Sequence, residues 1–295
     1  MLIHNDMPHD KLLMRDIWQN EDLTNKKVLV RLRGGISGER KAIGIGDVFL
    51  FIRFVNKLRE RGAQVVIEVH RSLEKIIKRN GYQIAHENES YDYQVPLISL
   101  PYIIGTKSPD LSNVLPYICY DEIIKKQRAK ELNPKTTNVG ISWRASNLPP
   151  LNRNIPFNQF LDVLAKIAKE KNITYYNMQG DLTQEELEQL PEDFPLVTLE
   201  GFDKNNNAFE DSAALIDLLD FCMFIDSSVL SLAGAMGSRK TFAILPADND
   251  WRWGIRENSD WFPTLMLIRQ REDEAKKNDW SRLLLEVGEK IAKKS

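Results

Sequence analysis

The stretch Leu218-Leu-Asp-Phe-Cys-Met-Phe-Ile-Asp-Ser-Ser-Val-Leu-Ser-Leu-Ala-Gly-Ala-Met-Gly237 decides the fold, together with Thr241-Phe-Ala-Ile-Leu245 just after it. Phe221–Ile225 is an unbroken apolar run, which is typical of a strand buried on both faces of a parallel sheet. Asp226-Ser-Ser228 then forms an N-cap cluster for a helix of small residues. Strand, capped helix and strand predict a β-α-β unit. The start of its helix is either a phosphate site or part of an ordinary crossover.

The rest of the C-terminal half continues this alternation of strands and helices. Pro156 is expected at the first position of a helix, because its ring fixes the backbone angle that a helix needs. Apolar residues then recur at the spacing i, i+3, i+4 and i+7, which gives that helix one buried face. The predicted strands are 138–143, 173–179 and 195–200, and the predicted helices are 156–167, 183–190, 210–220 and 278–293.

The N-terminal half shows the same alternation. A strand at 27–32 leads through a glycine-rich loop to an amphipathic helix that ends at Gly62, and this pattern calls for a right-handed parallel crossover. We therefore expect an α/β protein of two Rossmann-like domains facing across a cleft, one at 1–135 and one at 136–295. The other predicted elements are strands 64–69, 91–97 and 101–104, helices 73–79 and 125–132, and a linker at 133–137.

The composition is that of a globular chain, with 42% apolar and 28% charged residues among 295 and a formal net charge of −2. This charge gives no general attraction to nucleic acid or to an anionic membrane, and no apolar run approaches the roughly 18 residues of a membrane span. Cys119 and Cys222 lie far apart, which favours reduced thiols and a cytoplasmic location. We expect no metal site, because metal-ligand spacing is absent among the four histidines, His4, His9, His70 and His86.

Short motifs run through both halves of the chain. In the C-terminal half they are Val139-Gly-Ile-Ser-Trp143, Arg153-Asn-Ile-Pro156, Asn177-Met-Gln-Gly180, Phe209-Glu-Asp-Ser-Ala-Ala-Leu-Ile216, Ile225-Asp-Ser-Ser-Val229, Leu232-Ala-Gly-Ala-Met-Gly237 and Asp250-Trp-Arg-Trp253. In the N-terminal half they are Trp18 with Glu21-Asp-Leu23, Lys27-Val-Leu-Val30, Gly44-Ile-Gly-Asp47 and Pro96-Leu-Ile-Ser-Leu-Pro101. With these motifs, about residues 16–290 resemble GT-B glycosyltransferases of the heptosyltransferase-like kind, glycosyltransferase family 9. The chain is more closely similar to the glycosyltransferase domain found behind tetratricopeptide repeats in many bacterial proteins, here without the repeats.

The resemblance implies a nucleotide-diphosphate sugar bound between the two domains, a saccharide or protein acceptor, and neither a metal ion nor another cofactor. A leaving diphosphate must be neutralised, and the first N–H groups of the small-residue helix are placed to do so. The hydroxyls of Ser227 and Ser228 and the guanidinium of Arg144 would assist them. The candidate donor-binding residues are Gly44, Gly46, Arg144, Gln179, Asp226, Ser227, Ser228 and Ser231.

Asp47 ends the Gly-Ile-Gly-Asp run before a predicted helix. In the heptosyltransferase-like relatives, an acidic residue at this place is the proposed general base of an inverting single displacement, where it removes the acceptor hydroxyl proton. An aspartate here also suits an N-cap beside the positive end of the helix dipole. The two roles are compatible, and Asp47 is the candidate catalytic residue.

The departure at Ser231 keeps a second hypothesis open. Relatives usually carry histidine where this chain has Ser231, and serine cannot carry positive charge toward a phosphate. Arg144 replaces a small residue. The alternative is therefore a catalytically degenerate GT-B protein that binds nucleotide, glycan or a protein partner. A nicotinamide-dependent enzyme is disfavoured, because no Gly-x-Gly-x-x-Gly joins a strand directly to a helix.

A longer loop also departs from the family pattern, and it is either an acceptor-gripping loop or a solvated insertion. Asp211 either caps its helix or faces the ribose, and the cap is favoured. Trp251 and Trp253 are interpreted as packing residues rather than as a base-stacking platform, and His70 as an exposed histidine rather than a cleft residue. The basic residues of the loop, which spans 31–43, are Arg31, Arg33, Arg40 and Lys41.

Overall fold

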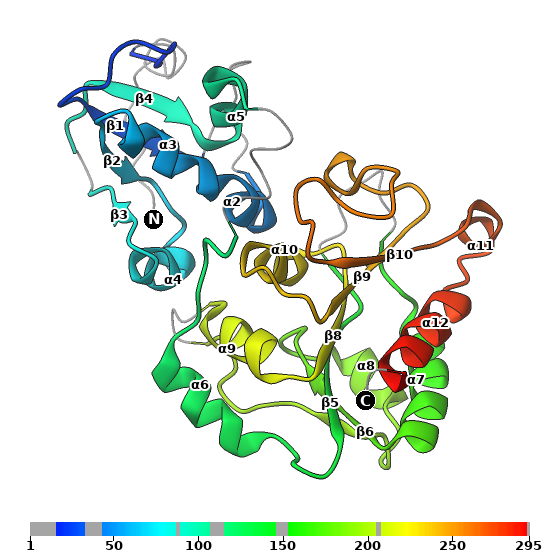
Figure 1. The fold of residues 1–295 in the computed structure, drawn as a ribbon. Helices are drawn as coiled ribbons and strands as arrows, with labels where there is room; N and C mark the ends of the chain where they lie inside the picture. The colour runs from blue at the N-terminus through cyan, green and yellow to red at the C-terminus, as the bar shows by residue number, and fades with distance from the viewer. Residues whose placement is uncertain are drawn as a thin grey trace.

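The computed structural model describes residues 16–32, 43–86, 89–106, 115–145, 153–204 and 208–293. These residues form two parallel β-sheets flanked by helices, one sheet in each half of the chain (Figure 1). The predicted α/β class with two Rossmann-like halves is confirmed.

The N-terminal sheet has four parallel strands in the order β3-β2-β1-β4. Its strands are β1 (Lys27–Arg31), β2 (Gln64–Ile67), β3 (Gln83–Ile84) and β4 (Tyr93–Pro96). Its helices are α2 (Ile45–Phe51), η1 (Ile52–Phe54), α3 (Val55–Glu60), η2 (Arg71–Leu73), α4 (Glu74–Arg79), η3 (Leu97–Ser99) and α5 (Leu100–Ile104).

The predicted strand at 101–104 is wrong, because these residues belong to helix α5. Pro101 lies in the first turn of α5, where its missing N–H removes no helical hydrogen bond, and Gly105 ends the helix with φ +72°. A short apolar run has no periodicity that separates a strand from a buried helix, so the sequence pattern was ambiguous there.

The C-terminal sheet has six parallel strands in the order β10-β9-β8-β5-β6-β7. Counted along the chain, this is the order 3-2-1-4-5-6 of dinucleotide-binding Rossmann folds. The strands are β5 (Thr137–Ser142), β6 (Ile173–Asn177), β7 (Leu196–Val197), β8 (Phe221–Ile225), β9 (Thr241–Leu245) and β10 (Met266–Arg269).

Helices cover both faces of this sheet (Figure 1). The side chains of α7 and α12 belong to one hydrophobic cluster, and those of α9 and α10 belong to a second one that extends into the N-terminal half. The helices are α6 (Glu122–Arg128), η6 (Ala129–Glu131), α7 (Phe157–Lys171), α8 (Gln184–Gln189), α9 (Glu210–Leu218), α10 (Ser228–Ala235), η7 (Trp251–Trp253), α11 (Glu272–Lys276) and α12 (Ser281–Ala292).

Helix α6 lies beside α9 (Figure 1), although it precedes the predicted domain boundary at residue 135. Arg128 of α6 donates to a carboxylate oxygen of Asp211 at 2.7 Å, and Lys125 forms an ion pair of 2.6 Å with Asp217. The position of the boundary stays a prediction, and the contacts of α6 are with the C-terminal sheet's helices.

The two halves meet where α2 packs against α10. Phe49 of α2 meets Phe209 edge to face, with ring centroids 5.1 Å apart. The Tyr117 N–H donates to the Ala235 carbonyl at 3.0 Å, and the Tyr117 hydroxyl donates to the Phe49 carbonyl at 2.7 Å. Burial raises the pKa of Tyr117, so this hydroxyl remains a donor. The first turn of α2 lies against the first turn of α10, at Gly46 and Ser228.

Among the described residues, no helix is long and apolar enough to cross a membrane.

Candidate functional site

The strand order of the C-terminal sheet reverses between β5 and β8. In open parallel sheets, ligands bind at such a reversal, outside the carboxyl ends of the strands. At this edge β5 ends at Ser142, and β8 leads into Asp226 and Ser227. Both Ser142 and Asp226 are almost fully buried, at 2% and 3% exposure. The reversal therefore places polar, buried groups where this fold binds its ligands.

The first turn of α10 is open rather than capped. Ser227 occupies the N-cap position with extended backbone, but its side chain accepts no hydrogen bond from the helix. The helix thus starts where the sequence predicts, while the predicted capping by its polar cluster is wrong. A helix start leaves its first N–H groups without intrahelical partners, and they carry partial positive charge. The Ser227 side chain therefore does not compete with an anion for these N–H groups.

Three hydroxyl groups at this edge lack partners. The buried side-chain oxygens of Ser142, Ser227 and Ser231 form no hydrogen bond with any residue the structure describes. A buried polar group left without a partner costs about 1–3 kcal/mol. Ser142 and Ser227 stand at the ends of β5 and β8, where a bound polar group would satisfy their hydroxyls, whereas Ser231 lies one turn into α10 against Gly46.

A charged network crosses from one half of the protein to the other. Arg252 donates from Nη2 to Oδ1 of Asp47 and from Nε to Oδ1 of Asp250, both at 2.8 Å. Arg153 donates from Nη1 to Asp226 at 3.3 Å. The network therefore holds two guanidinium groups and three carboxylates beside the start of α10.

Burial and the neighbouring charges shift the pKa values of Asp226 and Arg252 in this network. Burial raises the pKa of Asp226, and the nearby charges of Arg252 and Arg153 oppose that rise. For Arg252, burial disfavours the charged form. The bond to Asp250 and the charges of Asp47 and Asp226 outweigh it and raise the pKa of Arg252 above its usual value. Arg252 is therefore a fixed cation with a side chain only 12% exposed.

The start of α2 lies directly against α10. Gly44 is the N-cap of α2, and Asp47 is its third residue, so Asp47 is not an N-cap as one sequence hypothesis held. A Cβ on Gly46 would lie 3.0 Å from Oγ of Ser231 and 3.7 Å from Cα of Ser228. Because Ser231 is 1% exposed at this contact, the larger imidazole of a histidine would force the helices apart.

Gln179 and Arg144 are already engaged within the C-terminal half. The Gln179 side-chain oxygen accepts from the backbone N–H groups of Trp143 and Arg144 at 3.1 and 2.9 Å. The Arg144 guanidinium donates to Glu186 at 2.8 Å and to the Asp181 carbonyl at 2.6 Å. Gln179 therefore shapes the end of β5, and a phosphate contact by Arg144 stays a prediction.

Of the remaining sequence hypotheses, the cap at Asp211 is wrong and the exposure of His70 is confirmed. Asp211 does not cap α9: its carboxylate accepts from the Asp203 N–H and from Arg128, while Asp203 accepts from the first turn of the helix. Trp253 is fully buried, whereas Trp251 is 57% exposed and packs on Phe51 and Trp261. His70 is exposed, as expected.

The basic loop lies largely outside the described residues, at 33–42. The Ile43 N–H donates to the Leu32 carbonyl at 3.0 Å, so the two ends of this stretch lie side by side at the carboxyl end of β1. Of its basic residues, Arg31 is described, and its guanidinium lies 3.3 Å from the Tyr91 hydroxyl.

Solved structures share this architecture. A glycosyl transferase of family 9 from Veillonella parvula DSM 2008 superposes with a TM-score of 0.59 at 12% identity, over 93% of this chain and 99% of that chain. The E. coli ADP-heptose lps heptosyltransferase II superposes with a TM-score of 0.60 at 11% identity, over 91% of this chain and 99% of that chain. E. coli heptosyltransferase WaaC with ADP superposes with a TM-score of 0.52 at 13% identity, over 91% of this chain and 98% of that chain.

The chain has a glycosyltransferase fold. No protein-family model and no curated protein sequence matches it, so the likeness is one of fold. The site of this glycosyltransferase fold includes residues with no role predicted from the sequence. Arg153 and Arg252 belong to two of the motifs quoted above, yet their pairing with Asp226 and Asp47 depends on the folded arrangement.

Proposed function

We propose that this protein is a glycosyltransferase that moves a sugar from a nucleotide-diphosphate donor to a saccharide or protein acceptor, without a metal ion and with inversion. The observation that carries the proposal is the uncapped start of α10, with the unpartnered hydroxyl of Ser227, at the strand reversal of a glycosyltransferase fold. Helix N–H groups and fixed cations are what a leaving diphosphate needs.

The donor diphosphate is proposed to lie at the first turn of α10. There the N–H groups of the turn and the hydroxyls of Ser227 and Ser228 donate to its oxygens. Arg252 and Arg153 supply two positive charges, which now face Asp47, Asp226 and Asp250. A bound diphosphate competes with those carboxylates for the guanidinium groups.

Asp47 is the proposed general base. It stands at the start of α2, faces the C-terminal half, and is paired with Arg252 at 2.8 Å. In the proposed step the acceptor hydroxyl loses its proton to Asp47, its oxygen bonds to the anomeric carbon, and the bond from that carbon to the diphosphate breaks. Movement of Arg252 toward the diphosphate frees the carboxylate, so donor binding prepares the base.

Transfer and donor hydrolysis assays with a panel of nucleotide sugars test this function. The Asp47→Asn variant is expected to lose transfer by a factor of about 100 or more, because general bases contribute that much, while donor binding remains. Glu60→Gln, an exposed carboxylate of α3, is the matched control and should behave like the wild type. Equal activity of the Asp47→Asn variant and the wild type would remove Asp47 from this role.

A catalytically degenerate nucleotide- or glycan-binding protein is the second candidate. The favouring observations are the ion pair that occupies Asp47 and the tight contact of Gly46 with Ser231. Nucleotide binding without transfer to any acceptor would select this candidate.

A cytoplasmic location and the kinship with tetratricopeptide-repeat glycosyltransferases are also proposed. The first is supported by the cysteine pattern and the second by the sequence motifs.

A further inference from the structure

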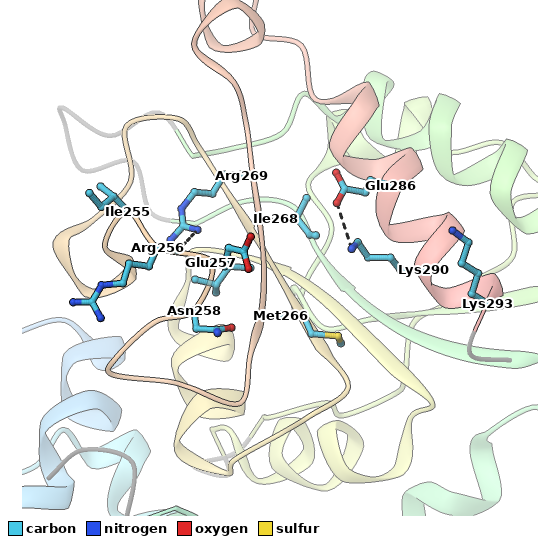
Figure 2. Close-up of a pocket in the computed structure, with 11 residues that line it drawn as sticks. Ile255, Arg256, Glu257, Asn258, Met266, Ile268, Arg269, Glu286, Lys290 and Lys293 are labelled. Atoms are coloured by element: carbon cyan, nitrogen blue, oxygen red, sulfur yellow. Dashed lines mark hydrogen bonds and ion pairs between the residues drawn. The ribbon is translucent and has the colours of Figure 1, made fainter. Parts of the chain in front are cut away.

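A pocket of about 610 Å³ lies at the far edge of the C-terminal sheet. Figure 2 shows its three parts: the strand β10, the segment 255–258 on one side, and the last turns of α12 on the other. None of the residues lining it belongs to the candidate donor site. Its function is therefore a separate question from the transfer reaction.

The floor of the pocket is the open edge of a sheet. β10 is the last strand in the order, and no described strand pairs with its outer side. The Gln270 N–H donates inward to Leu245 at 2.9 Å, and backbone groups alternate in direction along a strand. Those of Leu267 and Arg269 therefore point outward, as the bond from Arg282 to the Arg269 carbonyl at 2.8 Å confirms.

This edge is prepared to pair with another extended chain. The Arg269 carbonyl is engaged by Arg282, but the N–H and C=O of Leu267 and the N–H of Arg269 have no strand partner among the described residues. Leu267 and Arg269 are half-buried, and both line the pocket. Ile255, at 97% exposure, adds an apolar contact on one wall.

The pocket carries excess positive charge. The Arg269 guanidinium donates to the carbonyls of Arg256 and Trp253 at 2.6 and 2.7 Å, and it forms no ion pair with a carboxylate of the described chain. Burial lowers the pKa of Arg269, so its charge is held at a cost, and its buried Nε has no partner among the described residues. Lys290 and Lys293 line the opposite wall.

The acidic residues of the pocket do not cancel this charge. Glu286 lies between Arg282 at 2.9 Å and Lys290 at 3.5 Å, so it is already compensated. The lining holds two carboxylates, Glu257 and Glu286, against the four cations Arg256, Arg269, Lys290 and Lys293. Arg256 pairs with Asp260 at 3.5 Å and Lys290 with Glu286, while Arg269 and Lys293 form no ion pair among the described residues. An anionic ligand is therefore attracted, and a second copy of this edge is repelled by its own cations.

We propose that this pocket binds an extended acidic peptide segment of a partner protein, added as a strand beside β10. Backbone hydrogen bonds to Leu267 and Arg269 give the affinity of strand addition, and carboxylates on alternate residues meet the lysines of α12. The four residues of β10 match a peptide core of equal length. The same strand edge leaves the donor site at α10 free.

Fluorescence anisotropy of a labelled peptide of alternating Val and Glu, added to the whole chain, tests the proposal. Binding is expected to weaken at least tenfold when the peptide is N-methylated on the residues that face β10, because strand pairing then fails. Because only the peptide is changed, a loss of binding cannot come from misfolding of the protein. Equal binding of both peptides overturns strand addition.

Variants test the charge. The double variant Lys290→Gln with Lys293→Gln should bind the acidic peptide at least tenfold more weakly, and so should the wild type in high salt. Lys276→Gln with Lys277→Gln, on exposed positions in and after α11, is the matched control and should bind as the wild type. Absence of binding at millimolar peptide, tighter binding of a single-stranded oligonucleotide, or dimerisation that buries this edge contradicts the proposal.

Discussion

Two helix starts in the C-terminal half are built in opposite ways. At α8, the Thr183 hydroxyl accepts from the Glu186 N–H at 3.2 Å, and Glu186 accepts from the Thr183 N–H at 2.8 Å, which completes a capping box. At α10, Ser227 stands at the equivalent position and caps nothing. One start satisfies its own N–H groups, and the other leaves them open.

The difference teaches that a polar residue before a helix does not identify a cap. Thr183 follows the loop after β6, away from the strand reversal, whereas Ser227 follows β8 at the reversal, where this fold binds its ligands. α10 is instead held by packing, since Leu230, Leu232 and Ala233 are fully buried. The helix can remain uncapped because the burial of its side chains, rather than a cap, stabilises it.

The largest effect should come from disturbing that packing. A Cβ on Gly234 of α10 would lie 2.3 Å from the buried Phe262 ring, so Gly234→Ala should lower the free energy of unfolding by about 3 kcal/mol. Urea unfolding measures the change. Gly44→Ala is the control, because the nearest neighbour of its Cβ lies 3.4 Å away. Similar stability of both variants would contradict packing as the support of α10.

A pH-dependent effect is expected at a third helix start, that of α9. Asp203 accepts from the N–H groups of Asp211 and Ser212, and burial raises its pKa to about 6. The folded state therefore holds a proton that the unfolded state has lost, so this contribution to stability disappears as pH rises from about 4 to 6.

Between pH 4.5 and 7, the stability of the wild type relative to Asp203→Asn should fall by about 2 kcal/mol. Unfolding of both proteins in urea at the two pH values measures this double difference. A difference that rises with pH would mean that the hydrogen bonds to Asp203, rather than its burial, control the titration.

The smallest stability effects compare the two caps directly. Thr183→Ala should lower the free energy of unfolding by about 1 kcal/mol, because it removes a capping bond, while Ser227→Ala should change it by less than about 0.5 kcal/mol. Thermal unfolding of both variants measures the contrast. Equal losses would show that Ser227 does cap α10 in solution.

Much of the fold followed from local pattern. The apolar run at β8 and the small residues of α10 predicted a buried β-α-β unit, and the alternation of elements predicted two α/β halves. The run at 101–104 failed because it is too short to show a period, and Asp211 failed because the capping carboxylate comes from Asp203, eight residues earlier. Tertiary packing decides whether a short apolar run becomes a strand or a helix, and which carboxylate meets the start of a helix.

The site was predicted in its residue types and less well in its contacts. Ser227 and Asp47 were predicted from their positions at helix starts. Arg252 pairs with Asp47 across 205 positions of sequence, and no local spacing predicts a pair so far apart in the chain. Likewise Gln179 was expected at a ligand, and its oxygen instead holds the backbone after β5. Contacts between the two halves depend on how they dock.

Nucleotide binding by three proteins, measured by isothermal titration calorimetry with UDP, GDP, ADP and CDP, tests the open start of α10 most directly. The wild type and Thr183→Ala should bind one of these nucleotides equally well. Ser227→Ala should bind it about tenfold more weakly, because a hydrogen bond to a charged phosphate is lost. Equal affinity of Ser227→Ala and Thr183→Ala, or no binding of any nucleotide by the wild type, would contradict a diphosphate site at α10.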